Sequence, residues 1–290
     1  MTTTRYAVGS RPAGRFTALV YADPGLGKTH LLSTPPVDAL VVSIDRTGAE
    51  TLEKFPALLA GRGVQMWVEE AFSDGAAVDV LKDARKEIET ALKHGGPLPY
   101  RLVVLDGLCA LEDHIYADLV AHGGSLVQTT RPEMLSRAGW GALGSRHLRV
   151  RAAALAIPRV HVVFTALERT RDDEDTKIVV VEASLGGQQG RRYQADVSYV
   201  FRLCQVKTGS GTKAYLNFER RPNQRVKARR DDLLGGDGKR VEADLGVVMR
   251  RLGYIDAAGN VVEDVSPDDG SVGEVILAVE ARVAAEAALE

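Results

Sequence analysis

Ala22-Asp23-Pro24-Gly25-Leu26-Gly27-Lys28-Thr29 is the stretch of sequence that decides the fold. An apolar run at residues 16–21 precedes it, and His30-Leu31-Leu32 follows with a helical pattern. A strand, a glycine-containing loop and Gly-Lys-Thr at a helix start are the context that a phosphate-binding P-loop requires. Ala22 replaces the usual first glycine, but the two glycines nearest the phosphates are present.

The residue types of this loop suit a nucleotide and its metal ion. Backbone N–H groups and the positive end of the helix dipole attract phosphate oxygens. We expect Lys28 to reach the terminal phosphates of ATP and the Thr29 hydroxyl to hold Mg²⁺. The residues expected to contact the nucleotide here are Asp23, Pro24, Gly25, Leu26, Gly27, Lys28, Thr29 and His30.

A second acidic site follows a buried strand. Asp106 comes directly after the apolar run at residues 102–105, which puts a carboxylate at the carboxyl end of a strand beside the P-loop. We expect Asp106 to hold Mg²⁺ through water. Capping of the next helix is the alternative interpretation. The next residue is Gly107, where many ATPases carry a water-activating glutamate.

Composition places the chain among ordinary globular proteins. It has 290 residues, of which 45% are hydrophobic and 26% charged. No run approaches the ~20 apolar residues of a membrane span, and the first residues lack the apolar core of a signal peptide. We therefore expect a cytoplasmic protein without a membrane partner. Neither the two cysteines, Cys109 and Cys204, nor the six histidines have metal-site spacing.

The net charge of −2 hides an asymmetry. Residues 241–290 carry eleven acidic and three basic side chains, a net charge of −8, so the rest of the chain carries about +6. Basic residues are densest at residues 220–230. Such a cluster can attract phosphates, although a charge run is more often only a solvated face.

Strand and helix patterns alternate along most of the chain. The expected strands are residues 16–21, 39–44, 64–68, 101–106, 160–165 and 177–183, followed by the antiparallel pair 197–204 and 214–219. The expected helices are residues 74–94, which Ser73 or Asp74 caps, then 108–122 and 140–156. Residues 125–135 are expected to be a loop, residues 169–175 a charged turn, and residues 184–192 a Gly- and Gln-rich connection.

This alternation predicts an α/β fold with a mostly parallel central sheet and helices on both faces. The later strands would extend the sheet antiparallel, which is the layout of a RecA-like P-loop NTPase core. We expect an N-terminal lead at residues 1–15, the ATPase core at 16–240 and a small acidic helical tail at 241–290. In the tail we expect one helix at residues 241–253, a linker at 254–270 and a final amphipathic helix.

Beyond the P-loop, four further segments make the chain resemble the phage and prophage RecA-like ATPases known as nucleotide-binding or single-strand annealing recombination proteins. The resemblance covers roughly residues 15–235. The segments are Val104-Leu105-Asp106-Gly107-Leu108; Trp140-Gly141 with the basic helix leading to residues 161–168; Leu185-Gly186-Gly187-Gln188 with residues 195–200; and Arg225-Val226-Lys227-Ala228-Arg229.

The resemblance implies a bacterial host and a protein that oligomerises on single-stranded DNA. It also places Thr165 where a sensor reads the γ-phosphate, and puts a DNA-facing loop at residues 169–190. The arginines of that region would contact DNA: Arg169, Arg171, Arg191 and Arg192. Lys227 and Arg229 would reach the γ-phosphate of a neighbouring subunit as arginine-finger-like residues. A solvated or DNA-binding basic face is the alternative for these two.

The resemblance leaves the general base open. RecA-like enzymes place it just after the second strand, where this chain reads Ile44-Asp45-Arg46-Thr47-Gly48-Ala49-Glu50. Thr47 holds the position of the expected glutamate, so Asp45 and Glu50 are the nearby substitutes. The same pattern is consistent with slow hydrolysis.

These features favour a DNA-stimulated ATPase of phage recombination or annealing. The alternative is a nucleotide-gated switch or loader that hydrolyses slowly and binds a phage or host replication or recombination protein. A small-molecule kinase is disfavoured because no lid with an acceptor pocket is evident. An AAA+ motor is disfavoured because we find no helical lid domain and Gly107 replaces the glutamate after Asp106.

Overall fold

The computed structural model describes residues 15–52, 63–172, 177–209, 211–219, 221–228, 234, 239–256 and 261–262. Its centre is a nine-stranded sheet with the order β11-β10-β9-β1-β7-β4-β2-β3, and β8 pairs with β7 outside this path. The strands are β1 (Thr17–Ala22), β2 (Ala39–Ser43), β3 (Met66–Glu70), β4 (Leu102–Asp106), β7 (His161–Asp172), β8 (Val179–Ala183), β9 (Tyr199–Thr208), β10 (Gly211–Asn217) and β11 (Arg240–Glu242).

The sheet is parallel at its centre and antiparallel at one end. β1 pairs in parallel with β7 and β9, and β4 pairs in parallel with β7 and β2. β10 pairs antiparallel with β9 and β11, and β8 pairs antiparallel with β7. The predicted fold class, a mostly parallel α/β sheet with an antiparallel extension, is confirmed.

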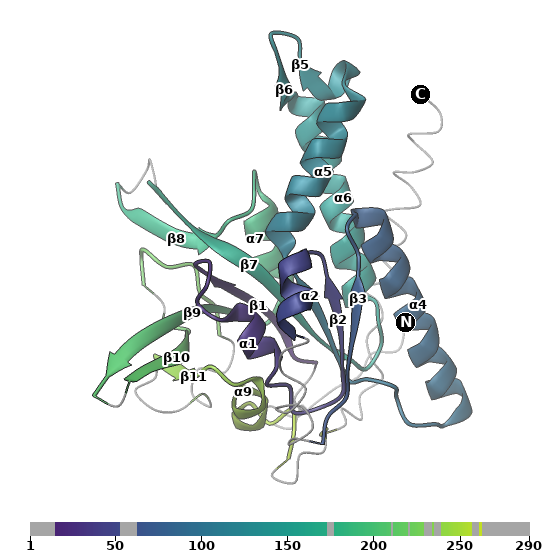
Figure 1. The fold of residues 1–290 in the computed structure, drawn as a ribbon, viewed down its shortest axis with the longest axis vertical. Coiled ribbons are helices and arrows are strands. Elements are labelled where there is room, and N and C mark those ends of the chain that lie inside the picture. Colours follow the sequence, from purple (N-terminus) through teal and green to yellow (C-terminus); the bar gives the residue numbers. More distant parts are fainter. Residues whose placement is uncertain are drawn as a thin grey trace, which may run out of the picture.

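Helices cover both faces of the sheet (Figure 1). They are α1 (Lys28–Leu32), α2 (Arg46–Leu52), α4 (Asp74–His94), α5 (Leu108–His122), α6 (Arg137–Leu155), α7 (Gln189–Asp196) and α9 (Leu245–Arg251). Every residue of β1 is buried, and alternate side chains enter two different cores. Leu19 joins the core that α4, α5 and α6 cover, whereas Val20 joins the core that α1 and α9 cover.

α5 and α6 extend beyond the sheet and carry a small β-hairpin at their far end (Figure 1). The hairpin consists of β5 (Val127–Gln128) and β6 (Arg131–Leu135), preceded by the 3₁₀ turn η1 (Gly124–Leu126). We had expected a loop at residues 125–135. The strands are short and mostly exposed, so the alternation of buried and exposed residues that marks a strand is missing from the sequence.

Two other elements differ from the sequence prediction. β7 runs on to Asp172, through the first part of the expected charged turn, because Arg169 and Arg171 lie on one side of the strand and both bind Glu182 of β8. α7 occupies part of the Gly- and Gln-rich connection. The fully buried ring of Tyr193 anchors this helix, and the glycines at residues 186, 187 and 190 are what suggested a connection instead.

The core continues past residue 240, where we expected an acidic tail to begin. β11 pairs with β10, and α9 begins after Asp244, whose carboxylate accepts a hydrogen bond from the N–H of Val247. Leu245 and Val248 of α9 are buried in the second core. The expected single helix at 241–253 is therefore a short strand followed by a helix, and the expected final helix lies outside the described residues.

The structure decides between the two predicted N-caps of α4. Ser73 is the N-cap, with its hydroxyl accepting from the N–H of Ala76 at 3.1 Å, and Gly95 ends the helix in the left-handed conformation. No helix in the described part of the chain is both long enough and apolar enough to cross a membrane.

Candidate nucleotide-binding site

The P-loop connects the buried end of β1 to the first turn of α1. Gly25 and Gly27 have φ angles of 77° and 91°, a conformation that side chains with a β-carbon rarely adopt. Gly27 is the N-cap of α1, so the free N–H groups of the first helical turn point toward the loop. This backbone has the conformation expected of a phosphate-binding loop, and its contact with a phosphate stays a prediction.

The ammonium of Lys28 lies within this loop. Its Nζ donates to the carbonyl oxygens of Ala22 and Asp23, at 3.2 Å in each case. Burial lowers the pKa of Lys28, and the nearby carboxylate of Asp106 opposes that shift. A half-buried ammonium held by two carbonyl oxygens is available to a stronger acceptor, such as a phosphate oxygen.

Asp106 stands at the end of β4, directly beside β7. It is only 5% exposed, and its Oδ1 accepts a 2.5 Å hydrogen bond from the hydroxyl of Thr165. The same hydroxyl accepts from the N–H of Gly107 at 3.0 Å. Burial raises the pKa of Asp106, and Asp45 raises it further, whereas Thr165 and Lys28 lower it. Gly107, not Asp106, is the N-cap of α5.

These groups surround a cavity of about 590 Å³. It is large enough for a small ligand such as a nucleotide. Its lining includes nine of the predicted site residues: Pro24, Gly25, Gly27, Lys28, Thr29, His30, Asp45, Asp106 and Thr165. Asp23 and Leu26 belong to the loop without lining the cavity.

The structure separates the two candidate bases. Asp45 lines the cavity, whereas Glu50 is an exposed residue of α2 outside the lining. Gly107 has a φ of 101°, and a β-carbon on it would stand 3.3 Å from both the backbone nitrogen and the β-carbon of Asp45. A glutamate after Asp106 is therefore disfavoured by the backbone itself, which leaves Asp45 as the better placed of the two carboxylates.

Several lining residues escaped the sequence analysis. Cys109, Ala110 and Asp113 follow Asp106 at intervals of three, four and seven residues, the spacing of one helix face. That period, counted from Asp106, would have found them. Gly48 gave no such signal. A β-carbon there would stand 2.8 Å from Oδ2 of Asp106, so α2 approaches this carboxylate too closely for any side chain at this position.

Comparison with protein families agrees with this geometry. Residues 15–230, most of the chain, match the family model of an AAA domain. The chain belongs to this family of P-loop ATPases. No curated protein matches the chain.

Members of this family generally bind a nucleotide with Mg²⁺, and the residues present fit that ion. Mg²⁺ prefers oxygen ligands and is bound in such sites through few protein groups. The hydroxyl of Thr29 and the carboxylate of Asp106 both line the cavity and supply such oxygens.

The two predicted arginine-finger-like residues lie elsewhere. The backbone of Lys227 forms an isolated antiparallel β-bridge with Val200. Its ammonium donates to the carbonyls of Gln194, Ala195 and Val197 at 3.0, 3.2 and 2.5 Å. It thus covers the C-terminal end of α7, where a positive charge is favourable. Lys227 does not line the cavity of its own chain, and Arg229 lies outside the described residues. Their action on a neighbouring subunit stays a prediction.

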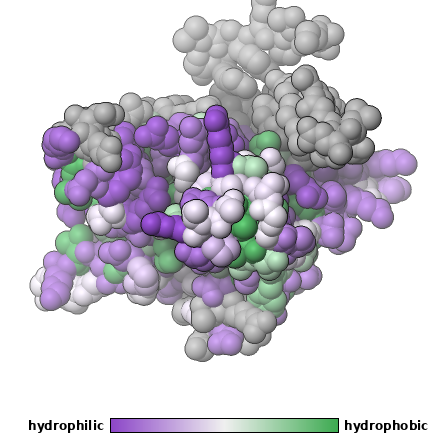
Figure 2. All heavy atoms as spheres, turned by 90° about the horizontal axis from the view of Figure 1, so that it is seen from above, coloured by the Kyte–Doolittle hydropathy of each residue, from purple (hydrophilic) through white to green (hydrophobic). Residues whose placement is uncertain are grey.

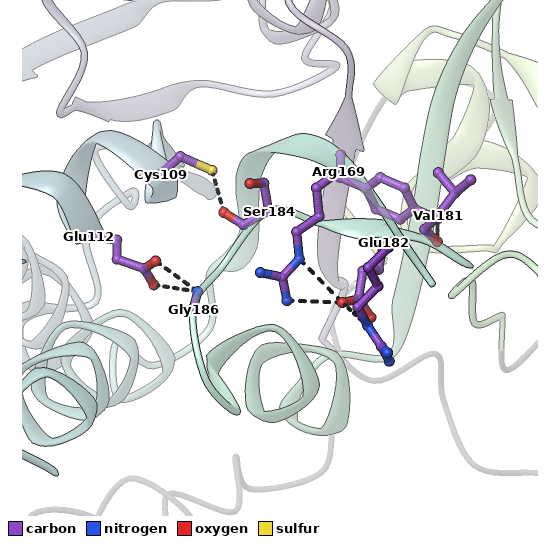
Figure 3. Close-up of polar contacts among 9 residues, drawn as sticks. Cys109, Glu112, Arg169, Val181, Glu182, Ser184 and Gly186 are labelled. Carbon is purple, nitrogen blue, oxygen red and sulfur yellow. Dashed lines mark hydrogen bonds and ion pairs between the residues drawn. The ribbon is translucent and has the colours of Figure 1, made fainter. Parts of the chain in front are cut away.

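α5 connects the cavity of this ATPase to the segment after β8 (Figure 3). The thiol of Cys109, which lines the cavity, donates to the carbonyl of Ser184 at 3.0 Å and accepts from the N–H of Leu167 at 3.2 Å. One turn further on, both carboxylate oxygens of Glu112 accept from the N–H of Gly186, at 2.7 and 2.9 Å. Burial raises the pKa of Cys109 to about 11, so the thiol stays protonated and donating at neutral pH.

Proposed function

We propose that this protein binds and hydrolyses ATP and oligomerises on single-stranded DNA in phage-type DNA recombination or annealing. The observation that carries the ATPase part is the pairing of a P-loop with a buried, hydrogen-bonded carboxylate in the lining of one cavity. The DNA and recombination part is supported by the sequence resemblance to phage RecA-like ATPases.

In this proposal the P-loop holds the phosphates. Lys28 exchanges its two carbonyl contacts for oxygens of the β- and γ-phosphates, and the N–H groups at the start of α1 bind the same anion. Thr29 and Asp106 would hold Mg²⁺, which when bound would supply positive charge to the phosphates. The hydrogen bond from Thr165 favours the ionised form of Asp106 and orients its carboxylate, and thereby links the position of β7 to the occupancy of the site.

Asp45 is the residue that we assign to orient the attacking water. It is the carboxylate of the candidate pair that faces the cavity, and it follows β2, the neighbour of β4 in the sheet. Glu50 is the alternative that the sequence left open. Lys227 and Arg229 would complete the site from a neighbouring subunit, as the resemblance implies, so full activity would require assembly.

ATP hydrolysis measured with and without single-stranded DNA tests this proposal, with Lys28→Ala as the inactive control. We expect DNA to raise the rate in the wild type and Lys28→Ala to abolish it. Mixing wild-type subunits with Lys227→Ala or Arg229→Ala subunits should lower the rate out of proportion to the mutant fraction. Nucleotide binding with no response to DNA would contradict the proposal.

Gly107 favours a second candidate function. The position after Asp106 is held in a conformation that excludes a glutamate, so hydrolysis can be slow. The protein would then be a nucleotide-gated switch or loader for a phage or host replication protein. That function predicts tight ATP binding, slow turnover and weak DNA affinity, which the same assay separates from the first proposal.

A further inference from the structure

An exposed tryptophan lies on α6, outside the nucleotide cavity. Trp140 is 42% exposed, and its ring packs edge-on against Tyr116 of α5 with 6.1 Å between the ring centroids. A second edge of the indole lies over a glycine pair. A β-carbon on Gly186 would stand 3.0 Å from its Cζ3, and one on Gly187 would stand 3.9 Å from its Cε3. The indole is thus supported from two elements while much of its surface stays open.

Arginines flank this indole along the same helix face. Arg137 precedes Trp140 by three residues and Gly144 follows it by four, so all three lie on one side of α6. The guanidinium of Arg192 lies over Gly144, with Nη1 3.5 Å from where a β-carbon would stand. Arg137 and Arg192 are both exposed, and neither forms an ion pair with a residue in the described ranges.

The loop beside the indole is open; its anionic neighbour is Glu112, whereas the start of α7 contributes partial positive charge. Gly186 and Gly187 place no side chain over the ring, and Gly187 takes a φ of 53° that favours glycine. The negative charge of Glu112 is bound by the N–H of Gly186. α7 begins two residues later, so its N-terminal N–H groups add partial positive charge on this side.

We propose that this Trp140 face, defined as Arg137, Trp140, Gly186, Gly187 and Arg192, binds single-stranded DNA. One base stacks on the indole and the two arginines bind the flanking phosphates. The proposal rests on the proposed function and assigns its DNA contact to one surface. An aromatic ring between cations is the combination that binds unpaired nucleotides without sequence preference, whereas a duplex keeps its base faces inside the stack.

The surroundings of the indole combine apolar and charged side chains. Figure 2 looks onto the end of the molecule that carries the β5–β6 hairpin, where white and green side chains gather with isolated purple ones rising among them. Met134 of β6 is 38% exposed there, but the indole itself has charged neighbours on its own helix face. Exposed Trp, Met and Arg also occur at protein interfaces, so the choice of DNA rests on the two arginines as phosphate ligands beside an open aromatic ring, and a protein partner is an outcome that the test below distinguishes.

The face is also bonded to the nucleotide cavity. The N–H of Gly186 donates to Glu112. Two residues earlier, the carbonyl of Ser184 accepts from the thiol of Cys109, which lines the cavity. A shift of α5 on nucleotide binding would therefore move the glycine pair against the indole. This connection gives the DNA surface a physical route to ATP-dependent affinity.

Tryptophan fluorescence tests the proposal directly. The chain has two tryptophans, so Trp67→Phe leaves Trp140 as the only reporter. We expect oligothymidylate to quench its emission at the same concentrations that raise the anisotropy of a labelled oligonucleotide. Trp140→Ala should weaken binding about tenfold to a hundredfold, and Trp140→Phe should retain most of it.

The arginines are tested through the salt dependence of binding. Arg137→Gln and Arg192→Gln should each lower the slope of log K against log salt by about one unit. Arg149→Gln, an exposed arginine on the opposite side of α6, is the matched control and should leave the slope unchanged.

The outcomes separate this inference from the function on which it rests. DNA binding by anisotropy with no quenching, and with full affinity in Trp140→Ala, would overturn the Trp140 face and leave the proposed function standing. Absence of DNA binding with and without ATP would overturn both. A Trp140 emission change that depends on protein concentration and not on DNA would assign the face to a second copy of the chain and refute the proposal.

Discussion

Replacement of Thr165 by valine should impair hydrolysis through the carboxylate of Asp106. Valine has nearly the shape of threonine, so the fully buried position keeps its packing and loses only the hydroxyl. That hydroxyl donates to Oδ1 of Asp106 at 2.5 Å and accepts from the N–H of Gly107 at 3.0 Å. The substitution leaves an acceptor and a donor without this partner in a buried site.

The size of the effect follows from the charge of the acceptor. A hydrogen bond to a charged group contributes about 1.5–3 kcal/mol, and one pKa unit corresponds to about 1.4 kcal/mol. Thr165 stabilises the ionised form of Asp106, so its loss raises a pKa that burial has already raised. The acid limb of the kcat profile should therefore move to higher pH by roughly one to two units. On the acid limb, where kcat falls tenfold per pH unit, the valine variant should be about tenfold or more slower than the wild type at the same pH.

Steady-state ATPase rates from pH 5 to 9 measure this shift, with Thr165→Ser as the control because it keeps the hydroxyl. Binding of a fluorescent ATP analogue, measured in parallel, should be far less affected, since the P-loop contacts are untouched. A valine variant with the wild-type rate and an unshifted acid limb would refute the role assigned to this hydrogen bond.

Three further predictions concern the same site and its connection to the segment after β8. Gly48→Ala would force the carboxylate of Asp106 to move by about 0.5 Å, so kcat should fall about tenfold or more. The control Gly75→Ala on α4 should leave kcat unchanged, and ATPase assays measure both variants. Asp106→Asn should raise thermal stability at pH 7, because the folded state binds a proton more tightly than the unfolded state and stability is lost as pH rises above the unfolded pKa. The gain should vanish below about pH 4 in thermal melts, and a gain that persists there would contradict the assigned burial cost. Glu112→Gln weakens the hold on the N–H of Gly186, so it should reduce DNA stimulation of hydrolysis several-fold while basal hydrolysis stays near wild type; an unchanged stimulation would argue against the α5 connection.

The parts of the site that could be predicted are those that depend only on residues close together in the sequence. The loop from Asp23 to Thr29 follows a fully buried strand and precedes a helix, and Asp106 ends another buried strand, so each could be found without knowing what lies across the sheet. The parallel order then brings their carboxyl ends together. Even the choice between Asp45 and Glu50 needed the direction of each side chain, which the sequence does not hold.

The parts that the sequence missed depend on long-range contacts. Gly48 matters because of an atom 58 residues away, and nothing around it in the chain marks that approach. β7 is long because Arg169 and Arg171 share one partner on β8, and a charge cluster read alone suggests a turn. α7 is anchored by a buried tyrosine, and an isolated eight-residue helix would be marginal without that packing, which the sequence around it does not indicate.

α5 explains how one short stretch of chain serves two surfaces. Its first turn stands on Gly107, whose left-handed conformation lets the chain leave β4 and enter the helix within one residue. From there, Cys109 and Asp113 face the cavity, and Glu112 lies about 60° around the helix axis from Cys109 toward the segment after β8. Because a helix moves as a rigid rod, a displacement imposed at Asp106 reaches both faces together. The site therefore has a glycine, not a glutamate, at the position after Asp106. The same glycine begins the helix through which we propose that the cavity is coupled to the glycine pair beside Trp140.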